Sequence, residues 1–433
     1  MRCSGGPSEP DLIDGMLQQV GHHMDRSYAD STARTDSYHL SAWKKACARL
    51  GTPMWRTDLA ANTGLDPVGH RRESLLVCLA FLLMYRDMRP RSRGDPMAKP
   101  QSCMNKLYAV RRAHERRGLK MVSLSMVDKV MKGMLRDYIL EHDVDALAPK
   151  RKVPFTNDMI IQMLATPDGA SLGTLAVNRQ SYFWVSAFAT VATLAETGQR
   201  KGDISKPKAT TPFQRGRMTF AKLVWRIAGE KVPDPSLAQL DSLGGHHDDG
   251  AWMVHGVMKN DVFAGSFGSK PSWLPYSNDA PRCAARHLAR LERWASVHGA
   301  SRATTPLFGP APGEEWYHSL IDRVLALLLR RGCGLSDAEA RAYSMHSFRI
   351  YLACALYSAG CPRDRILAIV RWRSDESLAI YARLNDSERA SWVARSMLAT
   401  VDSTVAAHLP HVDSDDLVAA LMAENGLGEV DAE

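Results

Sequence analysis

The sequence predicts a mainly α-helical protein of two domains, with a small antiparallel β-sheet inserted in the second domain. Most of the chain carries apolar runs with helical spacing and capping residues. A basic stretch bracketed by prolines, residues 148–157, separates these runs into two groups. The length of 433 residues, of which 45% are hydrophobic, is enough to build two cores.

The first domain is expected to be a helical module over residues 35–150. Residues 1–34 are rich in Gly, Ser, Pro and Asp without apolar periodicity, so a disordered lead-in is expected there. Ser74–Arg86 predicts a buried helix because its residues are almost all apolar. Two more helices are indicated by their ends, Ser102–Gly118 by the final glycine and Ser125–Glu141 by the initial serine.

The second domain is expected over residues 155–402, with Thr156 or Asn157 capping its first helix. It is mostly helical, apart from segments with aromatic and β-branched residues separated by Gly, Asp and Asn turns. These segments, which predict the small antiparallel sheet, are Arg217–Gly229, Trp252–Met258 and Pro271–Tyr276.

The net charge of +8 is unevenly distributed along the chain. Residues 36–152 hold 23 Lys and Arg against 12 Asp and Glu, a balance of +11. Residues 402–433 hold 8 acidic residues and no Lys or Arg, so 403–433 is predicted to be an acidic tail. A basic front half indicates a polyanionic partner, DNA or RNA, while the alternative is an ordinary solvated basic surface.

This positive charge is concentrated on and beside one predicted helix, Ser102–Gly118. Its basic residues could contact a DNA groove or backbone, or could form a solvated helix face. They are Arg111, Arg112, Arg116, Arg117 and Lys120.

Several classes of protein are disfavoured by the sequence. It has no apolar run long enough for a membrane helix and no signal-peptide pattern, so no membrane association is expected. The eight cysteines are isolated and form no CxxC pair, which disfavours a disulfide framework and a zinc knuckle. A P-loop and an acidic metal triad are also missing, so neither a metal nor another cofactor is expected. An intracellular location fits best.

Four separated segments carry residues suited to holding and attacking a phosphodiester. Singly, each has an ordinary structural interpretation: a surface ion pair, a solvated helix face, an exposed turn or core packing. Their order and spacing along the chain favour a functional interpretation of the four segments taken together. The residues are Arg200 in Glu196–Asp203, Lys259 in Val257–Asp261, His346 and Arg349 in Ser344–Arg349, and Trp372 nine positions before Tyr381 in Val370–Leu384.

This order resembles the tyrosine recombinase/integrase family, and within it the Cre type with Trp at the fifth position. TGQRKGD resembles the family's first arginine box, with Asp203 at the supporting carboxylate position. MVHGVMKNDVFAGSFGSKPSWLPY resembles its strand–lysine turn–strand, and RWRSDESLAIYARLNDSERASWVARSM its nucleophile segment and last helix. The strand and lysine turn are also similar to recombinase-like genes of Crypton- or DIRS-type mobile elements. The likeness is close over 155–402, and 35–150 resembles the family's core-binding, SAM-like DNA-clamping domain.

The resemblance implies a site-specific enzyme that breaks and rejoins double-stranded DNA through a covalent 3′-phosphotyrosine on Tyr381. Arg200 and Arg349 would neutralise the phosphate, His346 would act as general base and Lys259 as general acid. Trp372 would donate its indole N–H while its ring packs. The family works as a homotetramer on paired sites, in the nucleus of a eukaryote or the cytoplasm of a prokaryote.

Three positions depart from the family pattern or leave it open. Gln199 replaces an apolar residue, Lys201 adds a charge beside Arg200, and Lys270 is an alternative catalytic lysine because the gap from Arg200 to Lys259 is long. Two other functions also remain open. One is a domesticated relative that binds DNA or another protein without recombining it, and the other is a relaxing enzyme of the type IB topoisomerase kind.

Overall fold

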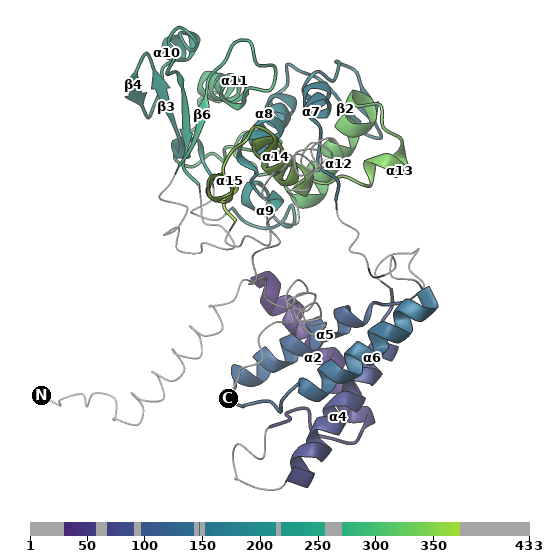
Figure 1. Cartoon of the computed structure of the whole chain (residues 1–433). Helices are drawn as coiled ribbons and strands as arrows, with labels where there is room; N and C mark the ends of the chain where they lie inside the picture. The colour runs from purple at the N-terminus through teal and green to yellow at the C-terminus, as the bar shows by residue number, and fades with distance from the viewer. Residues whose placement is uncertain are drawn as a thin grey trace, which may run out of the picture. The chain divides into compact units, whose positions relative to one another are not determined.

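The computed structural model describes residues 30–57, 67–90, 97–142, 147, 152–213, 218–255 and 271–372. The described part is mainly helical with small antiparallel sheets, as predicted. Contacts divide the chain into two compact units, Met1–Lys150 and Arg151–Glu433 (Figure 1). Within the described ranges, no helix is both long and apolar enough to cross a membrane. The predicted acidic tail and most of the predicted lead-in lie outside these residues.

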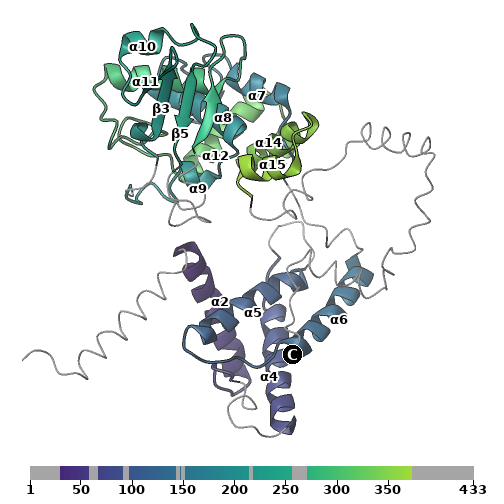
Figure 2. The ribbon, with the colours of Figure 1, turned by 60° about the vertical axis from the view of Figure 1, so that its left-hand side comes forward.

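The first unit is a bundle of helices around a small core. Helix α2 packs on α4 and α5, and α4 also contacts α5 and α6 (Figure 2). Trp43, Phe81 and Leu107 are fully buried between these helices. The bounds are α2 Asp30–Arg49, α4 Pro67–Arg86, α5 Pro100–Glu115 and α6 Ser125–His142.

Helix α4 differs from the prediction in two ways. It begins at Pro67 rather than Ser74, and it is not buried on all sides. Leu75, Leu79 and Leu82 are 48%, 47% and 39% exposed, while Val77 and Phe81 on the opposite face are fully buried. Composition alone predicted complete burial here, but a small helical bundle has too few neighbours to cover both faces of such a helix.

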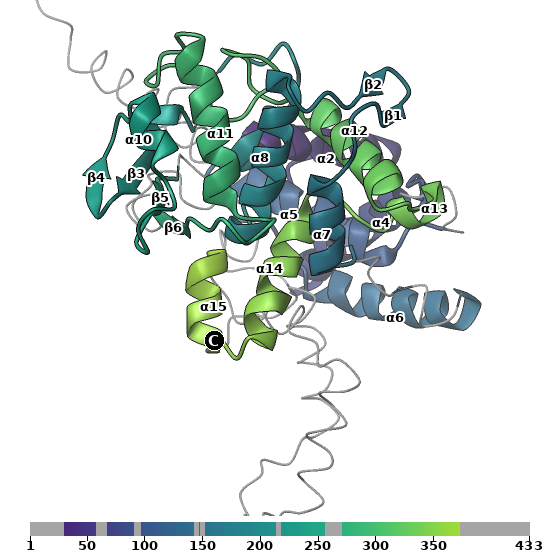
Figure 3. The same cartoon turned by 90° about the horizontal axis from the view of Figure 1, so that it is seen from above.

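The second unit is built around α8, Tyr182–Thr197, which is mostly apolar and buried on nearly every side. It packs on α7 (Asn157–Leu164), on α11 (Ala284–Val297) and on α14 (His346–Ser358), as Figure 3 shows. A helix surrounded in this way needs no polar face, which explains its composition. Of the two capping residues considered for α7, the structure selects Thr156, whose hydroxyl accepts from the Met159 N–H at 3.1 Å.

A four-stranded antiparallel sheet lies on one side of this unit, in the order β4-β3-β5-β6. The predicted segments supply β3 (Leu223–Ile227), β5 (Gly250–Met253) and β6 (Ser272–Pro275), so the inserted sheet is confirmed. Strands β5 and β6 pair from Gly250↔Pro275 to Met253↔Ser272. The prediction missed β4, Glu230–Val232, which is too short and too polar to show strand alternation. It also missed a two-stranded hairpin, β1 (Ser171–Leu172) with β2 (Leu175–Ala176).

The remaining helices complete the described part of the second unit. Helix α12 continues into a π-helical turn, and α14 and α15 pack on each other. Their bounds, with the other short helices, are α9 Lys201–Ile204, a 3₁₀ turn Phe220–Lys222, α10 Leu237–Asp241, α12 His318–Leu327, the π turn Leu328–Gly332, α13 Asp337–Ala340 and α15 Arg363–Val370.

Candidate active site

The candidate site forms where α8 ends. Gly198 follows the helix in the left-handed conformation, φ 58°, and its N–H bonds to the Leu194 carbonyl. A Cβ there would come within 3.2 Å of Leu352 Cδ2 and 3.6 Å of the Arg349 Cα, so the glycine permits close approach of α14. The chain then turns, and Arg200 lies immediately before α9 as its N-cap residue.

Asp203 supports Arg200 through the backbone. Its Oδ2 accepts the Arg200 N–H at 2.9 Å, which fixes the turn that presents the arginine. Arg200 itself is half-buried. Among the described residues, no hydrogen bond or ion pair engages its guanidinium. The carboxylate therefore positions the main chain at this point, while the side-chain charge stays available.

Helix α14 brings in the next two residues. His346 is its first residue and reaches the surface, whereas Arg349, one turn later, is only 2% exposed. The Arg349 guanidinium donates to the Gly198 carbonyl at 2.8 Å and to the Arg371 carbonyl at 3.1 Å. These two bonds join the end of α8 to the end of α15, with Arg349 between them.

Trp372 follows α15 and completes the described part of the site. It packs in a small cluster with Leu352 and Val370, and its exposed fraction is 9%. The centre of the Arg349 guanidinium lies 5.5 Å from the Trp372 ring centroid, within range of a cation–π interaction. Four of the six predicted catalytic residues, Arg200, His346, Arg349 and Trp372, are thus brought to one place from positions up to 172 residues apart.

The electrostatics of this place follow from its arginines. Desolvation lowers the pKa of His346 below its ordinary value of 6.5, and the positive charges of Arg349 and Arg200 lower it further. His346 is therefore neutral at pH 7 and can accept a proton. Its position at the N-terminus of α14 adds the positive end of the helix dipole. The site as a whole favours an anion.

Three residues of the site were not predicted as functional. Arg371, His255 and Gln199 are all buried, at 6%, 2% and 1% exposure. Arg371 donates to His255 Nε2 at 2.8 Å, and the other ring nitrogen lies 3.0 Å from the Gln199 amide. Gln199 is a polar residue at a position where the family pattern has an apolar one. Its buried partner His255, 56 residues away, explains that departure.

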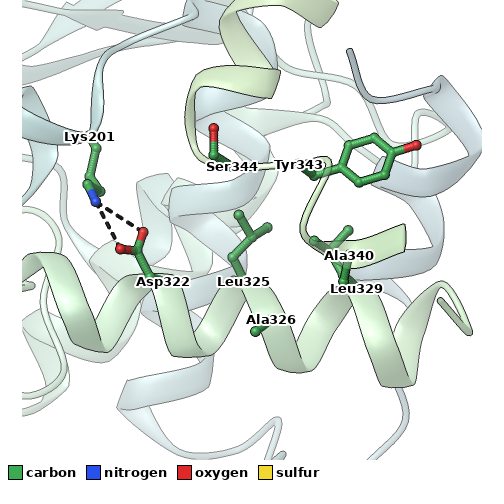
Figure 4. A pocket seen from close by; sticks show the side chains of 8 residues that line it. All are labelled: Lys201, Asp322, Leu325, Ala326, Leu329, Ala340, Tyr343 and Ser344. Carbon is green, nitrogen blue, oxygen red and sulfur yellow. Dashed lines mark hydrogen bonds and ion pairs between the residues drawn. The ribbon is translucent and has the colours of Figure 1, made fainter. Parts of the chain in front are cut away.

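The extra charge of Lys201 also has an explanation. Its ammonium pairs with Asp322 on α12, at 2.9 Å, so it does not add to the cations around Arg200. The pair closes one end of a hollow of about 290 Å³ beside the site. Leu325 and Ser344 lie along its middle, and Leu329, Ala340 and Tyr343 lie at the far end (Figure 4).

The two remaining predicted catalytic residues, Lys259 and Tyr381, lie outside the described residues, and so does Lys270. The structure does describe what flanks the lysine segment. Strand β5 ends two residues before Gly256–Lys270, and β6 begins at Ser272. Both candidate lysines therefore fall within the connection of an antiparallel pair, as the resemblance implies.

The basic residues of the first unit are used in different ways. Arg112 and Arg116 donate to the carboxylate of Asp36, at 2.7 and 2.6 Å, and Asp36 is only 3% exposed. Arg111 pairs with Glu115 at 3.1 Å on the same helix. Arg117 is exposed and lies over the Trp55 ring, and Lys120 beyond the helix is exposed too.

Three potential metal ligands come together in the described part of the second unit. The ligand atoms of His246, His247 and Asp248 lie within 4.8 Å of one another. However, Asp248 already pairs with Arg226 at 3.1 Å, and His246 Nδ1 accepts the Asp248 N–H. A cation would have to displace both interactions, so we assign no metal to this loop.

Neither a scan against models of known protein families nor a search of curated proteins finds a match to this chain.

Proposed function

We propose that this protein is a tyrosine-type DNA strand transferase, a site-specific recombinase or integrase that acts through a 3′-phosphotyrosine intermediate. The observation that carries the proposal is the convergence of Arg200, His346 and Arg349, with Trp372 against Arg349, at the end of α8. Along the chain these residues lie up to 172 positions apart. Chance would scatter them over the surface of a unit this large.

The arginines suit a phosphodiester under attack. Its non-bridging oxygens gain negative charge in the transition state, and guanidinium groups can donate to them in pairs. Arg349 is held in place by two carbonyl oxygens, so its charge is positioned without being neutralised by those acceptors. Arg200 supplies a second cation from the adjacent turn. Preorganised donors of this kind are each worth about 10²–10³ in rate.

The covalent step uses Tyr381 as the nucleophile. Its phenolic oxygen forms a bond to phosphorus while the bond from phosphorus to the 5′ oxygen breaks. The tyrosine proton passes to His346, whose lowered pKa keeps the ring neutral at pH 7. Lys259, or Lys270 in its place, protonates the leaving oxygen. The phosphotyrosine retains the bond energy, so rejoining to another strand requires no nucleotide hydrolysis.

The first unit would hold the DNA. Among its five basic candidates, Arg111, Arg117 and Lys120 are exposed, and we assign phosphate contacts to them. Arg112 and Arg116 instead fasten α5 to α2 through Asp36. Exchange of strands between two sites requires four nucleophiles, so we propose a homotetramer on paired DNA sites. Such an enzyme acts where its DNA is, in the nucleus of a eukaryote or the cytoplasm of a prokaryote.

The test begins by selecting binding sites from DNA that flanks the gene. A selected site is then nicked just beyond each candidate scissile phosphate, so that the short 5′-hydroxyl fragment diffuses away and traps the intermediate. We expect wild-type protein to form a covalent adduct and Tyr381→Phe to bind the same DNA without forming one. Wild-type binding without an adduct would instead indicate a silent DNA-binding relative. Relaxation of supercoils without any defined site would indicate a topoisomerase.

A further inference from the structure

Arg371 occupies an unusual position for an arginine. It ends α15 in the left-handed conformation, φ 57° and ψ 50°, where glycine is the usual residue because a Cβ is strained. It is also 6% exposed, so its charge has been removed from water. Glycine would avoid both costs. The side chain must therefore contribute something that offsets them.

Its guanidinium joins three other elements of the second unit. It donates to the Thr197 carbonyl at the end of α8 at 3.0 Å, to His255 after β5 at 2.8 Å, and to the Ser272 hydroxyl at the start of β6 at 3.3 Å. Meanwhile the carbonyl of Arg371 accepts from Arg349 at 3.1 Å. The main-chain carbonyl of Arg371 thus accepts a hydrogen bond from Arg349, and the side chain of Arg371 donates hydrogen bonds to α8 and to residues at the edge of the sheet.

The hydrogen bond between Arg371 and His255 determines which ring nitrogen of His255 carries the proton. A guanidinium can only donate, so the His255 Nε2 that faces Arg371 must be unprotonated and the proton must lie on Nδ1. That N–H needs an acceptor, and the Gln199 amide supplies one when its Oε1 faces the ring. In the opposite orientation the buried Oε1 has no hydrogen-bond partner. Burial and the Arg371 charge lower the pKa of His255 to about 3, so the ring stays neutral.

We propose that Arg371 is a positioning residue of the candidate site. Through the buried network of Gln199, His255, Ser272 and Thr197, it fixes the carbonyl that orients the Arg349 guanidinium and the backbone that presents Trp372. This proposal rests on the proposed function in that the geometry it maintains is the one required for phosphate binding. Arg371 does not itself touch DNA, because its guanidinium is already engaged on three sides.

The substitution Arg371→Gly tests the proposal without adding backbone strain, since glycine favours the left-handed conformation. We expect the folded variant to bind DNA within about threefold of wild type but to cleave it at least tenfold more slowly at saturating DNA. Guanidinium at millimolar concentration should restore part of the rate, whereas sodium chloride at equal ionic strength should not. Wild-type cleavage by the variant, or a parallel loss of binding and cleavage, would overturn the proposal.

A second readout does not depend on activity. The Arg349 charge lowers the pKa of His346, so displacement of its guanidinium in Arg371→Gly should raise that pKa toward 6.5. The measurement is an NMR titration of the His346 ring, assigned with His346→Gln. An unchanged pKa would contradict the positioning role even if the protein cleaves no DNA, which separates this proposal from the proposed function. If Arg371→Gly fails to fold, His255→Gln takes its place; slower cleavage and a raised His346 pKa are expected, an unchanged rate and pKa would contradict the proposal, and the guanidinium rescue does not apply.

Discussion

Arginines gather in two regions of this protein, and the groups that hold them differ. On α5 of the first unit, Arg112 and Arg116 donate to one buried carboxylate, Asp36. At the end of α8 in the second unit, Arg349 and Arg371 donate to main-chain carbonyls and to neutral side chains. A carboxylate cancels the charge that it binds, whereas a carbonyl fixes a guanidinium and leaves its charge in place.

This difference separates a structural arginine cluster from one suited to binding an anion. The pair on Asp36 fastens α5 to α2, and the carboxylate offsets one of the two positive charges. In the second cluster, burial lowers the pKa of His346, and the positive charges of Arg349 and Arg200 lower it further. Arginine count along the sequence does not distinguish these cases, but the acceptor of each guanidinium does.

The largest expected effect comes from Arg200, the arginine of the site whose guanidinium is not bonded within the described residues. Arg200→Ala should lower the rate of strand cleavage by about 10²–10³ because one preorganised donor is lost at the phosphate. Thermal stability should change little. Arg349→Ala would be harder to interpret, since Arg349 is buried and joins two helices.

The matched control is the adjacent Lys201→Ala, which removes a cation already paired with Asp322. It should cleave DNA within a few-fold of wild type. Cleavage by Arg200→Ala at the rate of this control would show that Arg200 has no role at the phosphate.

A second prediction contrasts the buried carboxylates of the two regions. Asp36 has two arginines, whereas Glu196 on α8 accepts the Ala284 N–H at 2.9 Å and has the charge of Arg282 nearby. Desolvation raises the pKa of Glu196 from 4.5 to about 7. The folded state therefore holds this proton more tightly than the unfolded chain. The stability that the proton contributes is present below pH 4.5 and is lost as the pH rises through 7.

Glu196→Gln removes this titration while keeping an oxygen for the Ala284 N–H. Relative to wild type, its free energy of unfolding should rise by about 2 to 3 kcal/mol between pH 4 and pH 9. Denaturant unfolding at several pH values measures the difference. A difference that does not vary with pH would mean that Glu196 is not desolvated in the folded protein.

The smallest of the three main effects is expected in the first unit. Arg116→Ala should lower the free energy of unfolding by about 2 kcal/mol because the buried Asp36 loses one of its two partners. Lys120→Ala, the exposed control, should leave stability within about 0.5 kcal/mol but reduce the salt dependence of DNA binding by about one counterion. If the two variants exchange these phenotypes, Arg116 contacts DNA and Asp36 does not need it.

The sequence predicted the inserted sheet because short strands and the turns between them depend on local composition and spacing. It also selected Arg200, His346, Arg349 and Trp372, which converge in the structure. It did not select His255 and Arg371, whose roles depend on a contact across 116 positions. For the same reason, Arg112 and Arg116 resembled a free basic surface, because Asp36 lies 76 and 80 residues before them. A pairing of this kind has no local sequence signal.

The most direct test of the account identifies the atom that becomes attached to DNA. Wild-type protein is trapped on a nicked suicide substrate, digested with protease and nuclease, and the modified peptide is sequenced by mass spectrometry. The account predicts one nucleotide joined through its 3′ phosphate to Tyr381. Attachment to a serine, to another tyrosine such as Tyr343 or Tyr357, or through a 5′ phosphate would contradict it.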